Sequence, residues 1–311
     1  MGIKRKKKVG ARPQKVNIRK EGTSASHGLE GGCAVRDAAT RSLTAARPAA
    51  PAAPVREGGR ACGGIEIRVG YAAAAAAGIS GDAAASCGLP GGSRALILSD
   101  GMGKGIKAAA GSRLVVARLR KNLKAGMPVA KAIKEVNRYM ICQAEAEAAK
   151  QNDGDCSGIE DFATADLTVI DRRSRRARFY KMGAATSFLM RQGHVRRIKG
   201  ESLPVGIIPK LRLTHISAVL REGDIIIMAS DGITDADRDD PEAEWLCRYL
   251  SGIDTGRLSA RQIASDILRE AQIRYGSREC DDLTVAAAVI VKGGTDGAED
   301  EEKNPKNYQR T

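Results

Sequence analysis

Apolar side chains recur along this chain in two patterns, one with a period of two residues and one with a helical period. Residues 65–69 place an apolar side chain at every second position, which is typical of a half-buried strand. Residues 95–98 are apolar throughout, which indicates a fully buried strand. Further strands, most of them separated by glycine-rich and charged turns, are predicted at 163–170, 177–182, 187–191, 211–219, 224–229 and 283–291.

Two helical blocks interrupt the strands. From 105 to 124, apolar side chains repeat at helical spacing up to a stop at Gly126, and Pro128 then opens a second helix. A later pair of helices is predicted over 242–250 and 259–274. Strands in runs and helices in pairs predict an α+β fold, with helices layered on antiparallel sheets, rather than a doubly wound parallel fold.

The net charge of +14 over 311 residues suggests nucleic-acid binding until the charges are located along the chain. Residues 1–60 carry 14 Lys and Arg against 4 Asp and Glu, so residues 61–311 keep a net charge of only +4. The first 60 residues join a basic block, Lys4 to Lys8, to a Pro/Ala-rich stretch without hydrophobic periodicity, and we expect a disordered tail. Because no aromatic side chain is interleaved to stack on bases, nucleic-acid binding is expected only as nonspecific contacts of this tail.

Composition also sets the other boundaries. Residues 293–311 are polar and acidic and are predicted to fray, which leaves 61–292 as the folded domain.

The charge-free stretch around the alanine run, 69–81, has 13 residues, whereas a membrane-spanning helix needs about 20. No apolar segment follows the basic N-terminus as in a secretory signal peptide, so a cytoplasmic location is expected. Seven scattered cysteines and three histidines predict neither a disulfide framework nor a zinc site.

Acidic residues recur where the apolar strands begin or end. Asp82 follows the first strand region, and Asp100 and Asp231 each follow an apolar strand and precede a glycine. Asp281 and Asp282 come directly before the last strand. Unpaired carboxylates at the edge of a core are costly, so such a group implies a cation or a set of donors. Oxygen-only ligand sets favour hard divalent ions such as Mg²⁺ and Mn²⁺.

The segment after Asp100 contains three glycines at alternating positions, Gly101, Gly103 and Gly105. Their spacing matches neither the dinucleotide-binding nor the P-loop pattern. Asp100 would also repel a bare phosphate unless a metal ion lay between them. Lys104 is close enough in sequence to contact a phosphate, although a solvated loop lysine is the simpler interpretation.

Several segments, in this order along the chain, resemble the metal-dependent PPM (protein phosphatase 2C-like) serine/threonine phosphatases, specifically the phosphatase domain of the stage II sporulation protein E family. They are ISGD (79–82), LSDGMGKG (98–105), FATADLTVID (162–171), KMGAATSFL (181–189), LPVGI (203–207), GDIIIMASDG (223–232) and DDLT (281–284). Each segment alone is a weak signal. Their shared order over about residues 63–292 makes the resemblance specific.

The resemblance implies an αββα four-layer sandwich, in which two antiparallel sheets are flanked by helix pairs and two Mn²⁺ or Mg²⁺ ions lie at one end. By position in the motifs, Asp100 would bridge both ions, and the remaining ligands would be Asp82, the Gly101 carbonyl, Asp231 and Asp281. Asp100 and Asp231 are therefore the catalytic candidates.

Two positions differ from the family pattern. Asp282 stands where many relatives have Asn, which implies a supporting role behind the ligands or, alternatively, ligation in place of Asp281. Met102 stands where many relatives have a His that is presumed to protonate the leaving group, so that proton must come from water or elsewhere.

The implied activity is hydrolysis of phosphoserine or phosphothreonine by metal-activated water. The implied substrate is a phosphorylated bacterial regulatory protein, such as an anti-sigma factor antagonist. The alternative is a catalytically weak phosphatase-fold scaffold that binds a phosphoprotein partner. The presence of every expected acidic position favours the enzyme, because a scaffold has no need of carboxylates that face one another at a core edge.

The predicted boundary near residue 60 leads to a first experiment. A chain that begins at Gly63 should remain soluble and should unfold cooperatively in urea at the same midpoint as the full chain, because the removed segment repeats no hydrophobic face. Loss of soluble expression on truncation would instead mean that the first 60 residues pack on the domain.

Overall fold

The computed structural model describes residues 64–76, 78–149, 162–237, 239–240, 242–254 and 258–293. The segments predicted as tails, 1–60 and all but the first residue of 293–311, lie outside these described residues. The boundaries of the folded domain therefore stay predictions.

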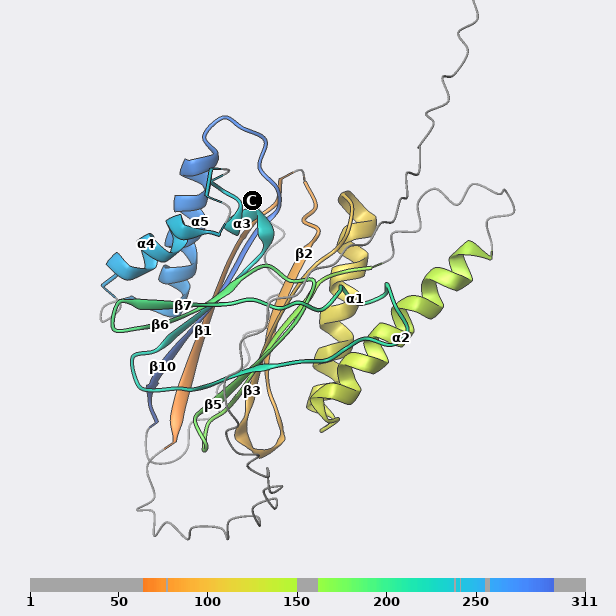
Figure 1. Cartoon of the computed structure of the whole chain (residues 1–311), viewed down its shortest axis with the longest axis horizontal. Helices are drawn as coiled ribbons and strands as arrows, with labels where there is room; N and C mark the ends of the chain where they lie inside the picture. Colours follow the sequence, from red (N-terminus) through yellow and green to blue (C-terminus); the bar gives the residue numbers. More distant parts are fainter. Residues whose placement is uncertain are drawn as a thin grey trace, which may run out of the picture. The chain divides into compact units, whose positions relative to one another are not determined.

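Two five-stranded antiparallel sheets stack face to face in the middle of the domain (Figure 1). The first sheet consists, in spatial order, of β1 (Ile65–Ala74), β10 (Leu283–Lys292), β9 (Ile225–Ala229), β6 (Ser187–Arg191) and β7 (His194–Ile198). The second consists of β2 (Asp82–Gly88), β3 (Arg94–Asp100), β4 (Ala165–Asp171), β5 (Arg176–Met182) and β8 (Ile216–Val219).

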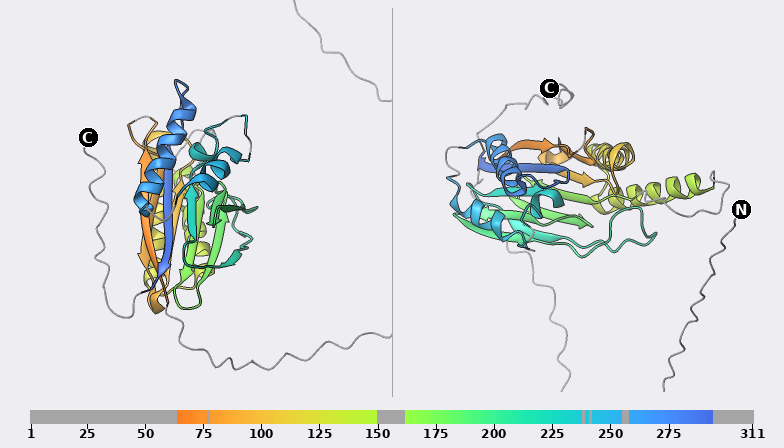
Figure 2. Two further views of the ribbon diagram at one scale, coloured as in Figure 1. Left: turned by 90° about the vertical axis from the view of Figure 1, so that its left-hand side faces the viewer. Right: turned by 90° about the horizontal axis from the view of Figure 1, so that it is seen from above.

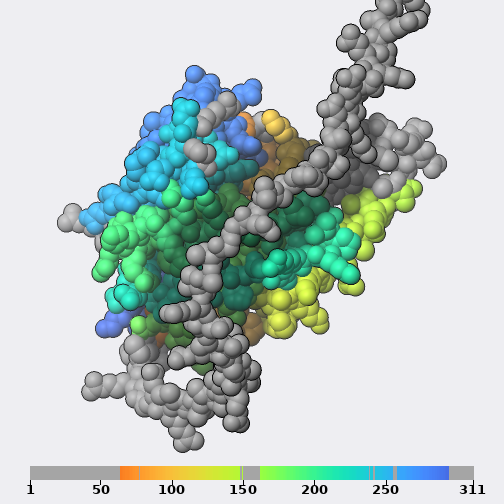
Figure 3. All heavy atoms as spheres, in the orientation of Figure 1, coloured from red at the N-terminus to blue at the C-terminus, as the bar shows by residue number. Residues whose placement is uncertain are grey.

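A pair of helices covers the outer face of each sheet. Helices α4 (Glu244–Gly252) and α5 (Ala260–Tyr275) lie on the first sheet, and α1 (Gly105–Lys124) and α2 (Val129–Ala148) lie on the second. Figure 2 shows the same layers from two other sides, and in Figure 3 the blue helices and the yellow-green α2 lie on opposite sides of the green strands. The predicted αββα sandwich is confirmed. Within the described ranges, no helix is both long and apolar enough to cross a membrane.

Strand β3 shows why the central strands are apolar throughout. Its alternating side chains enter two different cores: Ala95 and Ile97 pack under α1 and α2, while Leu96 and Leu98 pack between the two sheets. Both faces of the strand are therefore buried, which explains an uninterrupted apolar run instead of a period of two.

The helices begin and end where the sequence indicates. A capping box, in which Ser259 and Gln262 exchange side-chain and backbone hydrogen bonds, starts α5. Gly126, with φ of 79°, allows the turn between α1 and α2, and Pro128 immediately precedes α2. The short helices α3 (Asp231–Thr234) and η1 (Pro90–Gly92) were not predicted.

Four strands were missed or predicted with the wrong extent. One of them is β1, which was predicted at 65–69 and forms over Ile65–Ala74. The strand predicted at 211–219 forms only over Ile216–Val219, because β5 offers pairing partners to these four residues alone. Strand β2 was missed because three of its seven residues are consecutive alanines, which are poor indicators of a strand. Strand β7 was missed because it lies at the sheet edge and is mostly polar.

A buried ion pair within the second sheet is linked to the first sheet by a serine hydroxyl, near one end of the sandwich. The Lys181 ammonium on β5 donates to the Asp166 carboxylate on β4 at 2.5 Å and to the Ser187 hydroxyl on β6 at 2.8 Å. The Ser187 hydroxyl donates to the same Asp166 oxygen at 2.7 Å. Both charged side chains are almost fully buried. Each charge therefore depends on its partner for stabilisation.

Replacing Lys181 by Met should lower the free energy of unfolding by about 3–5 kcal/mol, because the Asp166 carboxylate would remain buried without its counter-charge. Urea unfolding followed by fluorescence of the single, fully buried Trp245 measures this loss.

Lys199→Met is the matched control, since its pair with Glu242 is exposed and should contribute at most about 1 kcal/mol. The double substitution Lys181→Met with Asp166→Leu should recover part of the loss. An equal, small effect at both lysines would contradict a structural role for the buried pair.

Candidate metal centre

Acidic residues from both sheets meet at one end of the sandwich. In the second sheet, Asp82 at the start of β2 pairs in register with Asp100 at the end of β3. In the first sheet, β9 ends where β10 begins, since Ala229 pairs with Val285, and this brings Asp231 and Asp281 to the same end. The predicted acidic residues are thus gathered from strands far apart in the sequence.

Asp82 is the most deeply placed of these residues. Its side chain is buried, and neither carboxylate oxygen has a hydrogen-bond partner of normal geometry among the described residues. Burial, together with the charges of Asp231 and Asp282, raises the pKa of Asp82 to about 7, although the nearby hydroxyls of Thr284 and Ser230 partly oppose this rise. A buried carboxylate without donors is a position that a cation would stabilise.

Asp100 is the carboxylate on which the charges of the other three ligand candidates act. Loss of hydration and the charges of Asp82, Asp231 and Asp281 raise its pKa to about 8. Loss of hydration and the charge of Asp281 also raise the pKa of Asp231. All of these effects oppose the ionised form, which is the form that a metal ion requires.

The neighbours Asp281 and Asp282 point to different tasks. Asp282 accepts backbone hydrogen bonds at both oxygens, from Ala76 at 2.8 Å and from Gly81 at 2.6 Å, and so holds the loop between β1 and β2. Among the described residues, Asp281 accepts only the amide of Asp282, at 2.8 Å, and its charge acts on Asp100 and Asp231. The geometry therefore favours Asp281 as the ligand candidate and a supporting role for Asp282.

Two glycines let other backbone segments approach the carboxylates closely. A Cβ atom on Gly101 would lie 1.8 Å from the Ala108 carbonyl oxygen of α1, and one on Gly232 would lie 2.3 Å from the Asp282 carbonyl oxygen. The Gly101 amide donates to the Gly81 carbonyl, whereas the Gly101 carbonyl accepts no hydrogen bond from the described residues. That carbonyl is therefore available to a cation.

The structure adds supporting residues that sequence reasoning missed. Thr164 accepts the Asp100 amide at its hydroxyl, at 2.8 Å, and donates its own amide to the Asp100 carbonyl, also at 2.8 Å. The Tyr275 hydroxyl donates to the Gly232 carbonyl at 2.9 Å. Thr164 lies inside the motif segment 162–171, so the family resemblance could have pointed to it. Nothing in the local sequence around Tyr275 indicated its contact 43 residues away.

An open cleft of about 620 Å³ adjoins the carboxylates. Its lining includes Lys104, Asp281, Tyr275 and the half-buried Cys280, so the predicted phosphate-contacting lysine faces the same space as Asp281. Met102, on the neighbouring loop, is exposed. A protein side chain could enter this cleft from solvent.

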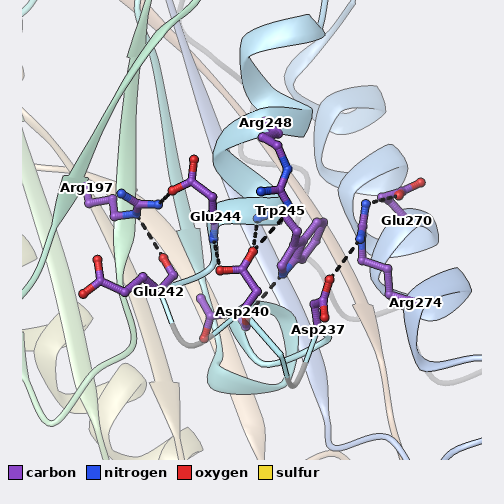
Figure 4. Close-up of polar contacts among 10 residues, drawn as sticks. Arg197, Asp237, Asp240, Glu242, Glu244, Trp245, Arg248, Glu270 and Arg274 are labelled. Atoms are coloured by element: carbon purple, nitrogen blue, oxygen red, sulfur yellow. Dashed lines mark hydrogen bonds and ion pairs between the residues drawn. The ribbon is translucent and has the colours of Figure 1, made fainter.

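The outer wall of the cleft is held by ion pairs and a helix cap, as Figure 4 shows. The Asp240 carboxylate accepts the amides of Glu244 at 2.9 Å and Trp245 at 2.5 Å at the start of α4, and these donors lower its pKa against the opposing effect of partial burial. Asp237 pairs with the Arg274 guanidinium, which lies over the Trp245 ring. The carboxylates of Asp240 and Asp237 are thus already engaged in hydrogen bonds and an ion pair within the wall.

The carboxylates fit a divalent ion by chemistry and by position. Within the described ranges, no three Asp, Glu, His or Cys side chains are already grouped at the spacing of a formed metal site. Carboxylates of like charge repel one another, so they draw together only around a cation. Four carboxylates, one of them the Asp82 carboxylate without donors among the described residues, and the Gly101 carbonyl form a set of hard ligands suited to Mg²⁺ or Mn²⁺.

Comparisons with known proteins agree with this geometry. The family model for stage II sporulation protein E matches residues 90–290. Stage II sporulation protein E of Bacillus subtilis is 31% identical over 228 residues, a match that covers 72% of this chain and 26% of that protein. The corresponding protein of Priestia megaterium is 30% identical over 228 residues, covering 73% of this chain and 36% of that protein. The chain thus spans about a quarter to a third of these relatives.

Solved structures show the same fold. A structure of the PP2C phosphatase domain with a fragment of the regulatory domain of SpoIIE from Bacillus subtilis has a TM-score of 0.64 and 28% identity, covering 75% of this chain and 64% of that one. A structure of RsbX in complex with magnesium has a TM-score of 0.52 at 18% identity, covering 73% of this chain and 96% of that one, which is a likeness of fold.

The raised pKa values predict an unusual pH dependence of stability. In a chelator, stability from protonated Asp82 should be fully present below its unfolded pKa of about 4 and should be lost as the pH rises through about 7. Asp82→Asn should therefore raise the free energy of unfolding by about 1–3 kcal/mol at about pH 8 and by much less at about pH 5.

Urea unfolding in EDTA at the two pH values measures this difference. Asp266→Asn on the surface of α5 is the control and should change little at either pH. A gain for Asp82→Asn that is no larger at the higher pH would show that the Asp82 carboxylate is not destabilising in the metal-free protein.

Proposed function

Because the chain belongs to the stage II sporulation protein E family, we propose that it is a cytoplasmic, metal-dependent protein serine/threonine phosphatase. The proposed reaction is hydrolysis of a phosphoserine or phosphothreonine ester by water. The observation that carries this proposal is the meeting of Asp82, Asp100, Asp231 and Asp281 where the two sheets end, with neither Asp82 oxygen having a donor among the described residues. A cation at this place would offset the cost of burying and crowding these charges.

The proposed cofactors are two Mn²⁺ or Mg²⁺ ions. Asp82, Asp100, Asp231, Asp281 and the Gly101 carbonyl would hold them, with water at the remaining positions. When bound, such ions supply an activated water and positive charge against the phosphoryl group. RsbX, which shares the fold, was solved in complex with magnesium, and we extend a requirement for Mg²⁺ or Mn²⁺ to this chain.

The chain's own residues have separate tasks in this scheme. Asp100, at the middle of the carboxylates, would bridge the two ions, and Asp231, at the first residue of α3, would orient one of them. Lys104 lines the cleft and would bind a phosphate oxygen. Because Met102 cannot donate a proton, the leaving serine or threonine oxygen would take its proton from solvent water.

The proposed substrate is a phosphorylated bacterial regulatory protein, such as an anti-sigma factor antagonist, in a sporulation or related signalling system. The cleft supports a protein substrate because it is open to solvent and adjoins exposed apolar side chains, among them Ile79, Met102 and Ile106. A small phosphorylated metabolite would instead favour an enclosed pocket.

Phosphopeptide hydrolysis should require added Mn²⁺ or Mg²⁺ and should stop in EDTA. Asp100→Asn and Asp231→Asn should each lower turnover by about 100- to 1,000-fold or more, because each removes a charge from the proposed metal site. Phosphate release from a phosphoserine peptide measures turnover. Calorimetric titration with Mn²⁺ should show weakened binding in the same variants.

Asp266→Asn, on the outer helix α5, is the matched control and should keep full turnover. Activity that survives EDTA, or near-normal turnover in both Asn variants, would overturn the assignment of these residues. Metal and phosphopeptide binding without any turnover would favour the scaffold alternative.

A further inference from the structure

A second open cavity, of about 590 Å³, lies along the outer edge of the second sheet, and its lining begins at Ala83, next to Asp82. Strand β2 is the outermost strand there, and helix α1 lies against it. The floor is formed by small or short side chains, namely Ala83, Ala84 and Ala85 of β2 with Val116 and Ala117 of α1. Because no large side chain fills this space, a groove remains between strand and helix, which we name the β2–α1 groove.

The rim of the β2–α1 groove is strongly basic. Arg113, Arg120, Lys121 and Lys124 line it, at spacings that place them on one face of α1. Among the described residues, Arg113, Arg120 and Lys121 have no carboxylate partner. On another face of the same helix Arg118 pairs with Glu135 of α2. The positive charges of Arg113, Arg120 and Lys121 thus have no counter-charge among the described residues, and the groove suits an acidic occupant.

The chain itself contains an acidic segment that begins close to this end of the domain. Residues 296–302 contain five carboxylates and no basic side chain. They follow Gly293, whose amide donates to the Gly64 carbonyl at 2.9 Å beside the paired ends of β1 and β10. This end of the sheets is opposite the candidate metal centre, because Leu283 at the other end of β10 lies next to Asp282.

The direction of α1 places the basic rim within reach of that segment. Helix α1 starts at Gly105, just after the metal centre, and ends at Lys124 at the opposite end of the sandwich (Figure 1). Strands β1 and β2 are each the outermost strand of their sheet and follow one another in the chain, so they lie on the same side. Nine residues, 294–302, can span about 30 Å when extended.

From this combination we infer that the acidic segment 296–302 docks on the basic rim of the β2–α1 groove of its own chain. The contact is electrostatic, and it places the segment along the helix whose residue Ala108 packs against Gly101 of the metal centre. Docking should weaken steeply as salt is added, because the charges lie at the surface. The inference does not depend on the phosphatase activity.

Carbodiimide crosslinking of the full-length chain tests the inference, since this reagent joins only carboxylates and amines in direct contact. Peptide mapping by mass spectrometry should find 296–302 joined to Lys121 or Lys124, with several-fold less product at about 0.5 M NaCl. Lys121→Gln with Lys124→Gln should remove this product. The control pair Lys131→Gln with Lys134→Gln, on the exposed surface of α2, should not change it.

A further variant probes the part of the rim that cannot be crosslinked. Arg113→Glu with Arg120→Glu should lower the yield at Lys121 several-fold, because it reverses the charge beside that lysine. A mixture of isotope-labelled and unlabelled chains should give crosslinks within one chain only. Mixed products would identify a second copy as the occupant of the groove. Products confined to Lys4–Lys8 would identify the basic N-terminal segment as the partner of 296–302. Either result, or the absence of any product at 296–302, overturns the inference.

Discussion

Crowding carboxylates at the edge of a hydrophobic core is the constraint on which the rest of this structure depends. Asp82 is buried and has no donor in the part of the chain that the structure describes. Its charge and those of Asp231 and Asp281 act on Asp100, so ionising the whole group in one place is unfavourable. The surrounding fold must supply enough stability elsewhere to hold these residues together. It does so with three layers of apolar side chains, one between the sheets and one under each helix pair.

Rigid backbone contacts, more than side-chain packing, fix where the carboxylates point. The Asp282 carboxylate holds the β1–β2 loop through two amides, Thr164 holds the backbone of Asp100, and Tyr275 holds the carbonyl of Gly232. Each of these contacts joins segments distant in the chain. These contacts hold the backbone from which the carboxylates project, so side-chain movements alone would let the carboxylates draw together around a cation.

Charge is divided between the two ends of the domain. The acidic cleft lies beside the candidate metal centre at one end, and basic side chains follow α1 toward the opposite end. The small net charge of residues 61–311 therefore hides two regions of opposite sign rather than an even mixture. Regions of this kind steer partners of complementary charge to different faces of the domain.

The sequence by itself determined the fold class, the helix pairs and the set of acidic residues at the ends of strands. Hydrophobic period and turn chemistry are local properties, so they can be read without the partner strands. The alanines of β2 and the polar edge strand β7 escaped prediction, since pairing with neighbours decides whether such residues form strands. Only the tertiary structure gave Asp282 its hydrogen bonds to the loop before β2, paired Lys181 with Asp166 and brought Tyr275 to Gly232. These outcomes depend on register and side-chain direction between distant segments, which no local pattern encodes.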